Sequence, residues 1–169
     1  MRLRRRDALF AAAALPWWST PVSAALPAPT GTVVLSVGGT LRAPNAGAEA
    51  QFDMAMLEAL PQHELRVRTP WYDGVRLFTG PLLRDVLDRA GAHGTALRAR
   101  ALNNYRVDIP VDDVRRWDVV LARLLDGKPM SVREKGPLFV MYPFDRHDEL
   151  RSAVYYSRCI WQLRSIEVR

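Results

Sequence analysis

Short runs of β-branched and apolar residues alternate along the chain with turn-forming residues, and this pattern predicts many short strands. Residues 65–69 alternate apolar and polar side chains, as a half-buried strand does. Asn103-Asn104 and Asp126-Gly127 each follow an apolar run and suit tight hairpin turns, because these residues tolerate positive φ. We expect strands at residues 32–37, 65–69, 75–78, 96–102, 105–109, 119–124, 137–142 and 158–168.

Helical spacing is confined to a few segments. The clearest is 81–90, where Gly80 and Pro81 precede a single apolar stripe and Gly91 closes it. A shorter helix is expected between Phe52 and Leu60, and a helical turn from residue 110. Because strands and helices do not alternate regularly as in βαβ units, the pattern of mixed short strands with a few helices predicts an α+β or mostly-β domain.

The N-terminus has the order of a secretory signal peptide. A basic stretch is followed by an apolar run at 8–18, too short for a bilayer, which needs about 20 residues, and by Val22-Ser23-Ala24 as a cleavage signal. We predict a signal peptide at 1–24, a linker at 25–31, a single domain at 32–169, and a periplasmic or secreted location. Arg5-Arg6 also resembles a twin-arginine signal, so the Sec and twin-arginine routes both stay open.

The net charge and the cysteine content limit which classes of site the chain can form. The chain carries a net charge of +6, of which +3 belongs to residues 1–24, so the remaining +3 is too small and too dispersed for a nucleic-acid surface. Three widely spaced histidines and one cysteine offer no zinc spacing, and no phosphate-binding loop is present. We therefore expect no metal site, surface histidines, no transmembrane segment beyond the signal peptide, and a buried apolar role for Cys159.

Hydrogen-bonding, cationic and aromatic residues recur near the predicted strand ends and turns. Together they are suited to an anionic, planar ligand, with cations for the charge and aromatics for the ring. The candidate binding residues are Asn103, Asn104, Tyr105, Arg133, Lys135, Tyr142, Arg158 and Trp161.

A family resemblance rests on four segments that occur in a fixed order along the chain. They are Gly80-Pro81-Leu82-Leu83, Asn103-Asn104-Tyr105, Lys135-Gly136-Pro137-Leu138 and Ile160-Trp161. From about residue 32 to the C-terminus the chain resembles the oxidoreductase molybdopterin-binding domain family, which is sulfite-oxidase-like. The resemblance implies the mixed α+β fold of that family and a molybdopterin pocket lined by loops. It also assigns cofactor binding to Asn103, Asn104, Tyr105, Arg133, Lys135, Arg158 and Trp161.

The same resemblance identifies what this chain lacks. Family members carry a molybdenum-binding cysteine just upstream of the Gly-x-Pro-Leu helix, and here that position falls at or beside Thr69. A threonine hydroxyl stays protonated and is a poor substitute for a thiolate. Phe139 replaces the usual arginine after Gly-Pro-Leu, and Cys159 lies far downstream of the ligand position.

Three functions follow as hypotheses. The leading one is an exported domain without a competent molybdenum centre that binds a pterin or small anion, or serves a periplasmic protein partner as an accessory or sensing protein. The second is an active periplasmic molybdenum-cofactor oxidoreductase, with the metal held by the pterin alone or by Cys159. The third is a structural interaction module.

Overall fold

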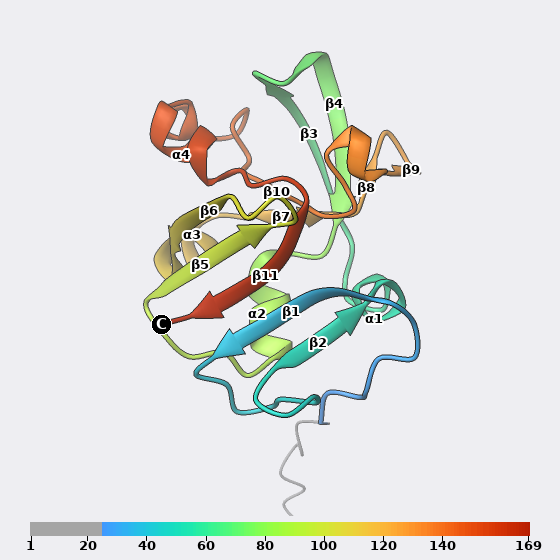
Figure 1. The fold of residues 1–169 in the computed structure, drawn as a ribbon. Coiled ribbons are helices and arrows are strands. Elements are labelled where there is room, and N and C mark those ends of the chain that lie inside the picture. Colours follow the sequence, from blue (N-terminus) through green and yellow to red (C-terminus); the bar gives the residue numbers. More distant parts are fainter. Residues whose placement is uncertain (1–24) are drawn as a thin grey trace, which may run out of the picture.

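The computed structural model describes residues 25–169, which fold into three small sheets and four short α-helices. The predicted signal peptide lies outside the described residues. The largest sheet has five strands in the order β2-β1-β11-β5-β6 (Figure 1). Its strands are β1 (Val33–Gly39), β2 (Ala50–Asp53), β5 (Ala96–Ala101), β6 (Arg106–Pro110) and β11 (Leu163–Val168).

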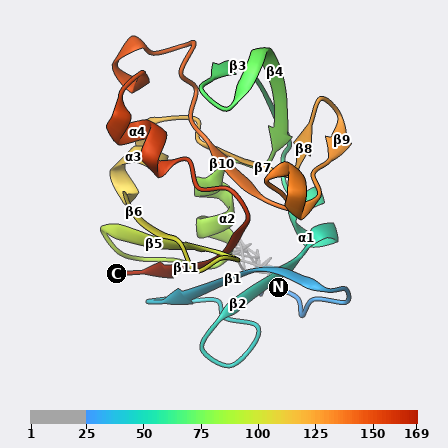
Figure 2. The same ribbon diagram turned by 45° about the horizontal axis from the view of Figure 1, so that its top comes forward.

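Two smaller sheets lie beside the five-stranded sheet (Figures 1 and 2). A four-stranded sheet has the order β3-β4-β8-β9, and β7 pairs with β10. The long hairpin of β3 (His63–Thr69) and β4 (Tyr72–Gly80) extends away from the five-stranded sheet (Figure 1). The shorter strands are β7 (Val120–Ala122), β8 (Leu124–Leu125), β9 (Lys128–Pro129) and β10 (Phe139–Met141).

The helices are short, as expected. They are α1 (Met54–Glu58), α2 (Leu83–Arg89), α3 (Val111–Arg116) and α4 (Ala153–Arg158), with 3₁₀ turns at Val132–Glu134 and Asp148–Leu150. Helix α2 lies between the five-stranded sheet and the β7–β10 pair (Figure 2). The observed mixture of strands and helices agrees with the α+β class expected from the pattern.

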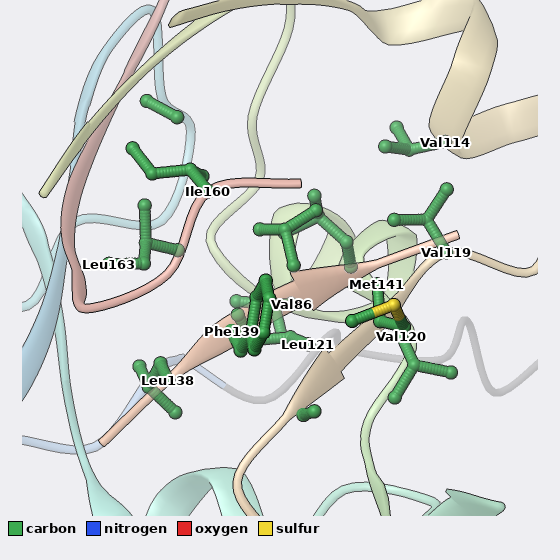
Figure 3. Close-up of a cluster of buried hydrophobic side chains, with 14 of the residues drawn as sticks. Val86, Val114, Val119, Val120, Leu121, Leu138, Phe139, Met141, Ile160 and Leu163 are labelled. Atoms are coloured by element: carbon green, nitrogen blue, oxygen red, sulfur yellow. The ribbon is translucent and has the colours of Figure 1, made fainter. Parts of the chain in front are cut away.

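One continuous core joins the layers. Phe139 of β10 lies beside Leu121 of β7 and Val86 of α2, and Ile160 and Leu163 approach from the C-terminal segment (Figure 3). Close packing explains the glycine at the end of β4. A Cβ on Gly80 would lie 2.0 Å from the carbonyl oxygen of Leu121, so no side chain fits between these strands.

The sequence pattern misplaced several boundaries. The final strand does not begin at Arg158, because residues 153–158 form α4. Strand β2 overlaps the start of the helix expected between Phe52 and Leu60, and β4 begins at Tyr72, earlier than the strand expected at residues 75–78. Helix α2 begins at Leu83, because Gly80 still belongs to β4. Short elements such as α4 lack enough turns for a periodic apolar stripe, so their stability depends on tertiary contacts.

The hairpin turns follow the prediction. Asn104 has a φ of 68°, and Asp126 and Gly127 have φ of 49° and 77°, the left-handed geometry expected at a tight turn. The histidines differ from the expectation. His63, His93 and His147 are half-buried, and the ring of His147 lies 4.5 Å from that of Trp117.

Residues 25–31, expected to be a linker, lie against the domain. Leu26 is buried, and Asp53 accepts hydrogen bonds from the backbone amides of Thr30 and Gly31, each at 2.8 Å. The second carboxylate oxygen of Asp53 caps α1 through the amide of Met56 at 2.9 Å. One side chain thus joins the start of the domain to its first helix.

Candidate functional site

An aromatic pocket of about 340 Å³ opens between four segments that are distant in the sequence. Its walls come from the β3–β4 turn, the β5–β6 turn, the end of α4 and the segment before β11. We call it the aromatic pocket, and it is lined by Trp71, Ala101, Asn103, Tyr105, Tyr156, Ser157, Cys159, Ile160 and Trp161.

Trp71 is the central ring of this pocket. Its ring centroid lies 5.9 Å from that of Trp161 and 6.2 Å from that of Tyr156, both in edge-to-face geometry. Phe139 supports Trp71 and Trp161 from the core, at 5.6 Å and 6.0 Å. Rings held by neighbouring rings on several sides form a stiff apolar wall, which favours a planar ligand.

The turn that carries Trp71 is tied to the rest of the molecule. The pairing of β3 with β4 shifts register between Arg68 and Thr69, and the backbone amide of Arg68 donates a hydrogen bond to Asp145 at 2.9 Å. Thr69, at the position expected for the family's molybdenum ligand, has a buried Oγ1 that finds no hydrogen-bond partner among residues 25–169. Thr69 is therefore a buried, unsatisfied neutral hydroxyl two residues before Trp71, and it is not among the residues that line the aromatic pocket.

Cys159 lies in the wall of the same pocket. As expected, it is a buried free cysteine, with 2% of its surface exposed. Burial raises the pKa of the thiol from 9.0 to about 12, although a backbone hydrogen bond at Tyr142 acts in the opposite direction. The thiol is therefore protonated at neutral pH. The fold places it in the same pocket as Trp71.

An ion pair between the half-buried Arg158 and the buried Asp113 attaches α4, and with it this wall of the pocket, to the core. Arg158 donates a hydrogen bond to Asp113 Oδ2 at 2.6 Å, and the hydroxyl of Tyr142 donates to the same oxygen at 2.8 Å. Burial first, and then the charge of Asp113, raise the pKa of Tyr142. The guanidinium of Arg158 also lies over the ring of Tyr155, 5.1 Å from its centroid.

The structure divides the predicted binding residues among several places. Asn103, Tyr105 and Trp161 line the aromatic pocket. The side chain of Asn104 instead accepts hydrogen bonds from Arg100, and that of Arg158 is paired with Asp113.

The remaining two predicted cations are also outside the pocket lining. The ammonium of Lys135 lies 4.8 Å from the centroid of the Tyr72 ring, and Arg133 is exposed. The side chains of Arg133, Lys135 and Arg158 are therefore not gathered around one ligand.

Sequence reasoning missed the contribution of α4 to the pocket. Tyr156 and Ser157 are lining residues, and their helix was not predicted. The paired aromatics Tyr155-Tyr156 after Ser152 were the available signal, since Ser is common before a helix and two aromatics seldom face solvent together.

Within residues 25–169, no three His, Cys, Asp or Glu side chains gather closely enough to hold a metal ion. In the same part of the chain, no helix has the length and apolar character needed to cross a membrane.

The fold resembles that of a solved oxidoreductase. The chain is similar to the sulfane dehydrogenase SoxCD from Paracoccus pantotrophus, with a TM-score of 0.57 and 16% sequence identity. The likeness covers 79% of this chain but only 37% of that one, so this chain spans little more than a third of its neighbour. At this identity the likeness concerns the fold alone. No protein-family model and no curated protein sequence matches the chain.

Proposed function

We propose that this chain is an exported binding protein that keeps the fold of molybdopterin-dependent oxidoreductases and holds a planar, pterin-like ring without a competent molybdenum centre. The observation that supports this most directly is the aromatic pocket. It unites Trp71, Asn103, Tyr105 and Trp161, which come from three separate segments, around one cavity. The fold likeness to a sulfane dehydrogenase agrees with this background.

The ring of a pterin matches the pocket chemically. Flat aromatic walls from Trp71, Tyr156 and Trp161 suit a flat ligand, and Asn103 offers an amide donor and acceptor for a heterocycle edge. The mouth is accessible, since Tyr105 is 50% and Trp161 36% exposed. Exposed aromatics at the rim also offer a protein partner a means to sense whether the pocket is filled.

The metal end of the cofactor fits poorly. The ligand position offers the neutral hydroxyl of Thr69, and the pocket's own thiol, Cys159, is held protonated by burial. No cation is among the residues that line the pocket, so a phosphate tail would meet no positive charge there. The arrangement therefore favours ring binding over metal-centred redox chemistry.

Molybdenum content tests the proposal first. The protein is purified from the periplasm of a host that makes molybdenum cofactor, and metal and pterin are quantified separately. We expect substoichiometric molybdenum, because no thiolate is available. Stoichiometric metal would overturn the proposal.

Pterin titration, followed by tryptophan fluorescence, tests the pocket itself. We expect Trp161→Ala to weaken binding about tenfold, the effect of losing one stacking partner. Trp117→Phe removes an indole that is outside the pocket lining and should leave the affinity unchanged. Equal affinity in Trp161→Ala and the parent protein would exclude this pocket.

One observation favours the second candidate, an active molybdenum enzyme: Cys159 lines the same pocket as Trp71. In that case the parent protein would contain molybdenum, and Cys159→Ser would lose it. If Cys159→Ser retained the metal, the pterin alone would hold the molybdenum.

A further inference from the structure

The outer face of the five-stranded sheet carries a second, chemically different groove. This face is turned to the viewer in Figure 1 and away from α2 in Figure 2, and within residues 25–169 no helix or strand covers it. An open groove of about 500 Å³ lies on it. None of the residues that line it also lines the aromatic pocket.

Strand pairing brings four polar residues into one line across this face. Ser36 of β1 is opposite Ser165 of β11, Ser165 is opposite Arg100 of β5, and Arg100 is opposite Arg106 of β6. Neighbouring strands are about 4.8 Å apart, so these side chains are adjacent along the line. We call this set the Ser-Arg row, and all four of its residues line the groove.

In the next line of residues across the sheet, the positive and negative charges are balanced. There Arg98 is opposite Glu167 on one side and Asp108 on the other. Arg98 makes two hydrogen bonds to Asp108, at 2.8 Å and 3.0 Å, and Arg169 donates to Glu167 at 2.9 Å. Each arginine of that region therefore has a carboxylate partner.

The charges of the Ser-Arg row are not balanced in this way. Arg100 and Arg106 are directly opposite each other, and like charges in that position destabilise a sheet. Arg100 donates to the neutral side chain of Asn104, which orients the guanidinium without cancelling its charge. Within residues 25–169, no hydrogen bond or ion pair of the Arg106 side chain is found.

Two carboxylates, Glu49 and Glu167, also line the groove. Glu49 accepts a hydrogen bond from the neutral amide of Gln51 at 3.2 Å and keeps its charge. The pKa of Glu167 is lowered first by its hydrogen bond from Arg169, and only to a smaller extent by the charges of Arg98 and Arg106. Four arginines and two carboxylates line the groove, so its lining is net positive. Neither Arg100 nor Arg106 is in an ion pair among residues 25–169, which leaves the excess positive charge at these two residues.

We propose that the Ser-Arg row binds a tetrahedral dianionic oxyanion, phosphate or sulfate, either free or as the end group of a larger molecule. Two guanidiniums supply charge and paired N–H donors, and Ser36 and Ser165 supply hydroxyl donors. A bound dianion relieves the repulsion between Arg100 and Arg106. The small serine side chains leave room above the sheet for the oxyanion.

The site is tested by calorimetric titration of the full mature protein with inorganic phosphate and with sulfate, at constant ionic strength set by chloride. We expect saturable binding that Arg100→Gln and Arg106→Gln each weaken about tenfold, as the loss of one charge-assisted contact does. Arg66→Gln is the matched control, because Arg66 is an exposed strand arginine outside the groove lining. It should bind like the parent protein.

Two further measurements distinguish a specific oxyanion site from non-specific electrostatic attraction. Ser165→Ala keeps every charge, so weaker binding in this variant supports hydrogen bonding within the row. Glycerol 3-phosphate binding more tightly than phosphate would identify the oxyanion as part of a larger ligand. The proposal is overturned if neither anion nor glycerol 3-phosphate binds at millimolar concentration, or if Arg66→Gln weakens binding as much as Arg100→Gln.

Discussion

Cys159 lines the aromatic pocket and is almost fully buried. A thiol reacts through its thiolate, and burial of Cys159 disfavours the charged form. Its chemistry in this protein is therefore that of a small apolar group in a pocket wall.

Alkylation measures this property. With the pKa of Cys159 raised to about 12, iodoacetamide at pH 8 should label the native protein far more slowly than the urea-unfolded protein. A matched control moves the thiol two residues, by Ser157→Cys in a Cys159→Ser background. Ser157 is exposed, so that protein should be labelled rapidly in the native state. Fast native labelling of Cys159 itself would contradict the buried, protonated thiol.

At the scale of elements, the carboxylate of Asp113 connects helix α3 with helix α4 and with the segment that follows β10. Asp113 of α3 accepts from Tyr142, which follows β10, and from Arg158 at the end of α4. Since α4 is a short helix, its position depends on this contact and on its ring contacts. The wall formed by Tyr156 and Cys159 depends in turn on α4.

Asp113→Ala should therefore lower the free energy of unfolding by about 2 kcal/mol, because it leaves the buried Tyr142 hydroxyl and the half-buried Arg158 cation without their partner. It should also weaken pterin binding. Asp112→Ala is the control, since Asp112 is the exposed neighbour in the same first turn, and its effect should be small. Urea denaturation measures both variants, and equal stability in the two would refute the role of Asp113.

At the scale of the whole molecule, residues 25–31 are part of the folded unit. Hydrogen bonds from the amides of Met56, Gly31 and Thr30 lower the pKa of Asp53 below 3.8, so the folded state favours the ionised carboxylate. The stabilisation is then complete above pH 3.8 and is lost as the pH falls through the lowered pKa.

The difference in thermal midpoint between the parent protein and Asp53→Ala should accordingly be largest near neutral pH and shrink as the pH falls below 3.8. Thermal unfolding at a series of pH values measures it. Glu64→Ala serves as control, because Glu64 is exposed and its side chain takes part in no hydrogen bond or ion pair found within residues 25–169. A difference that grows toward acid would contradict the assignment.

Local patterning is sufficient for the α+β class, the β5–β6 and β8–β9 turns, the apolar stripe of α2 and the burial of Cys159. These features depend on the intrinsic preferences of a few consecutive residues, which a sequence displays directly. The absence of cysteine near Thr69 is equally a property of the chain alone. Export and cofactor binding stay predictions.

Proximity between distant segments is decided only by the tertiary structure. Trp71 and Cys159 share a pocket, Arg158 is neutralised by Asp113, and Arg100 faces Arg106 across a sheet. Each of these relations depends on strand register and on how the layers pack, and no local preference encodes them. For the same physical reason, only Asn103, Tyr105 and Trp161 of the predicted binding set meet in the aromatic pocket. The cationic groove is lined by other residues, which the sequence pattern did not single out.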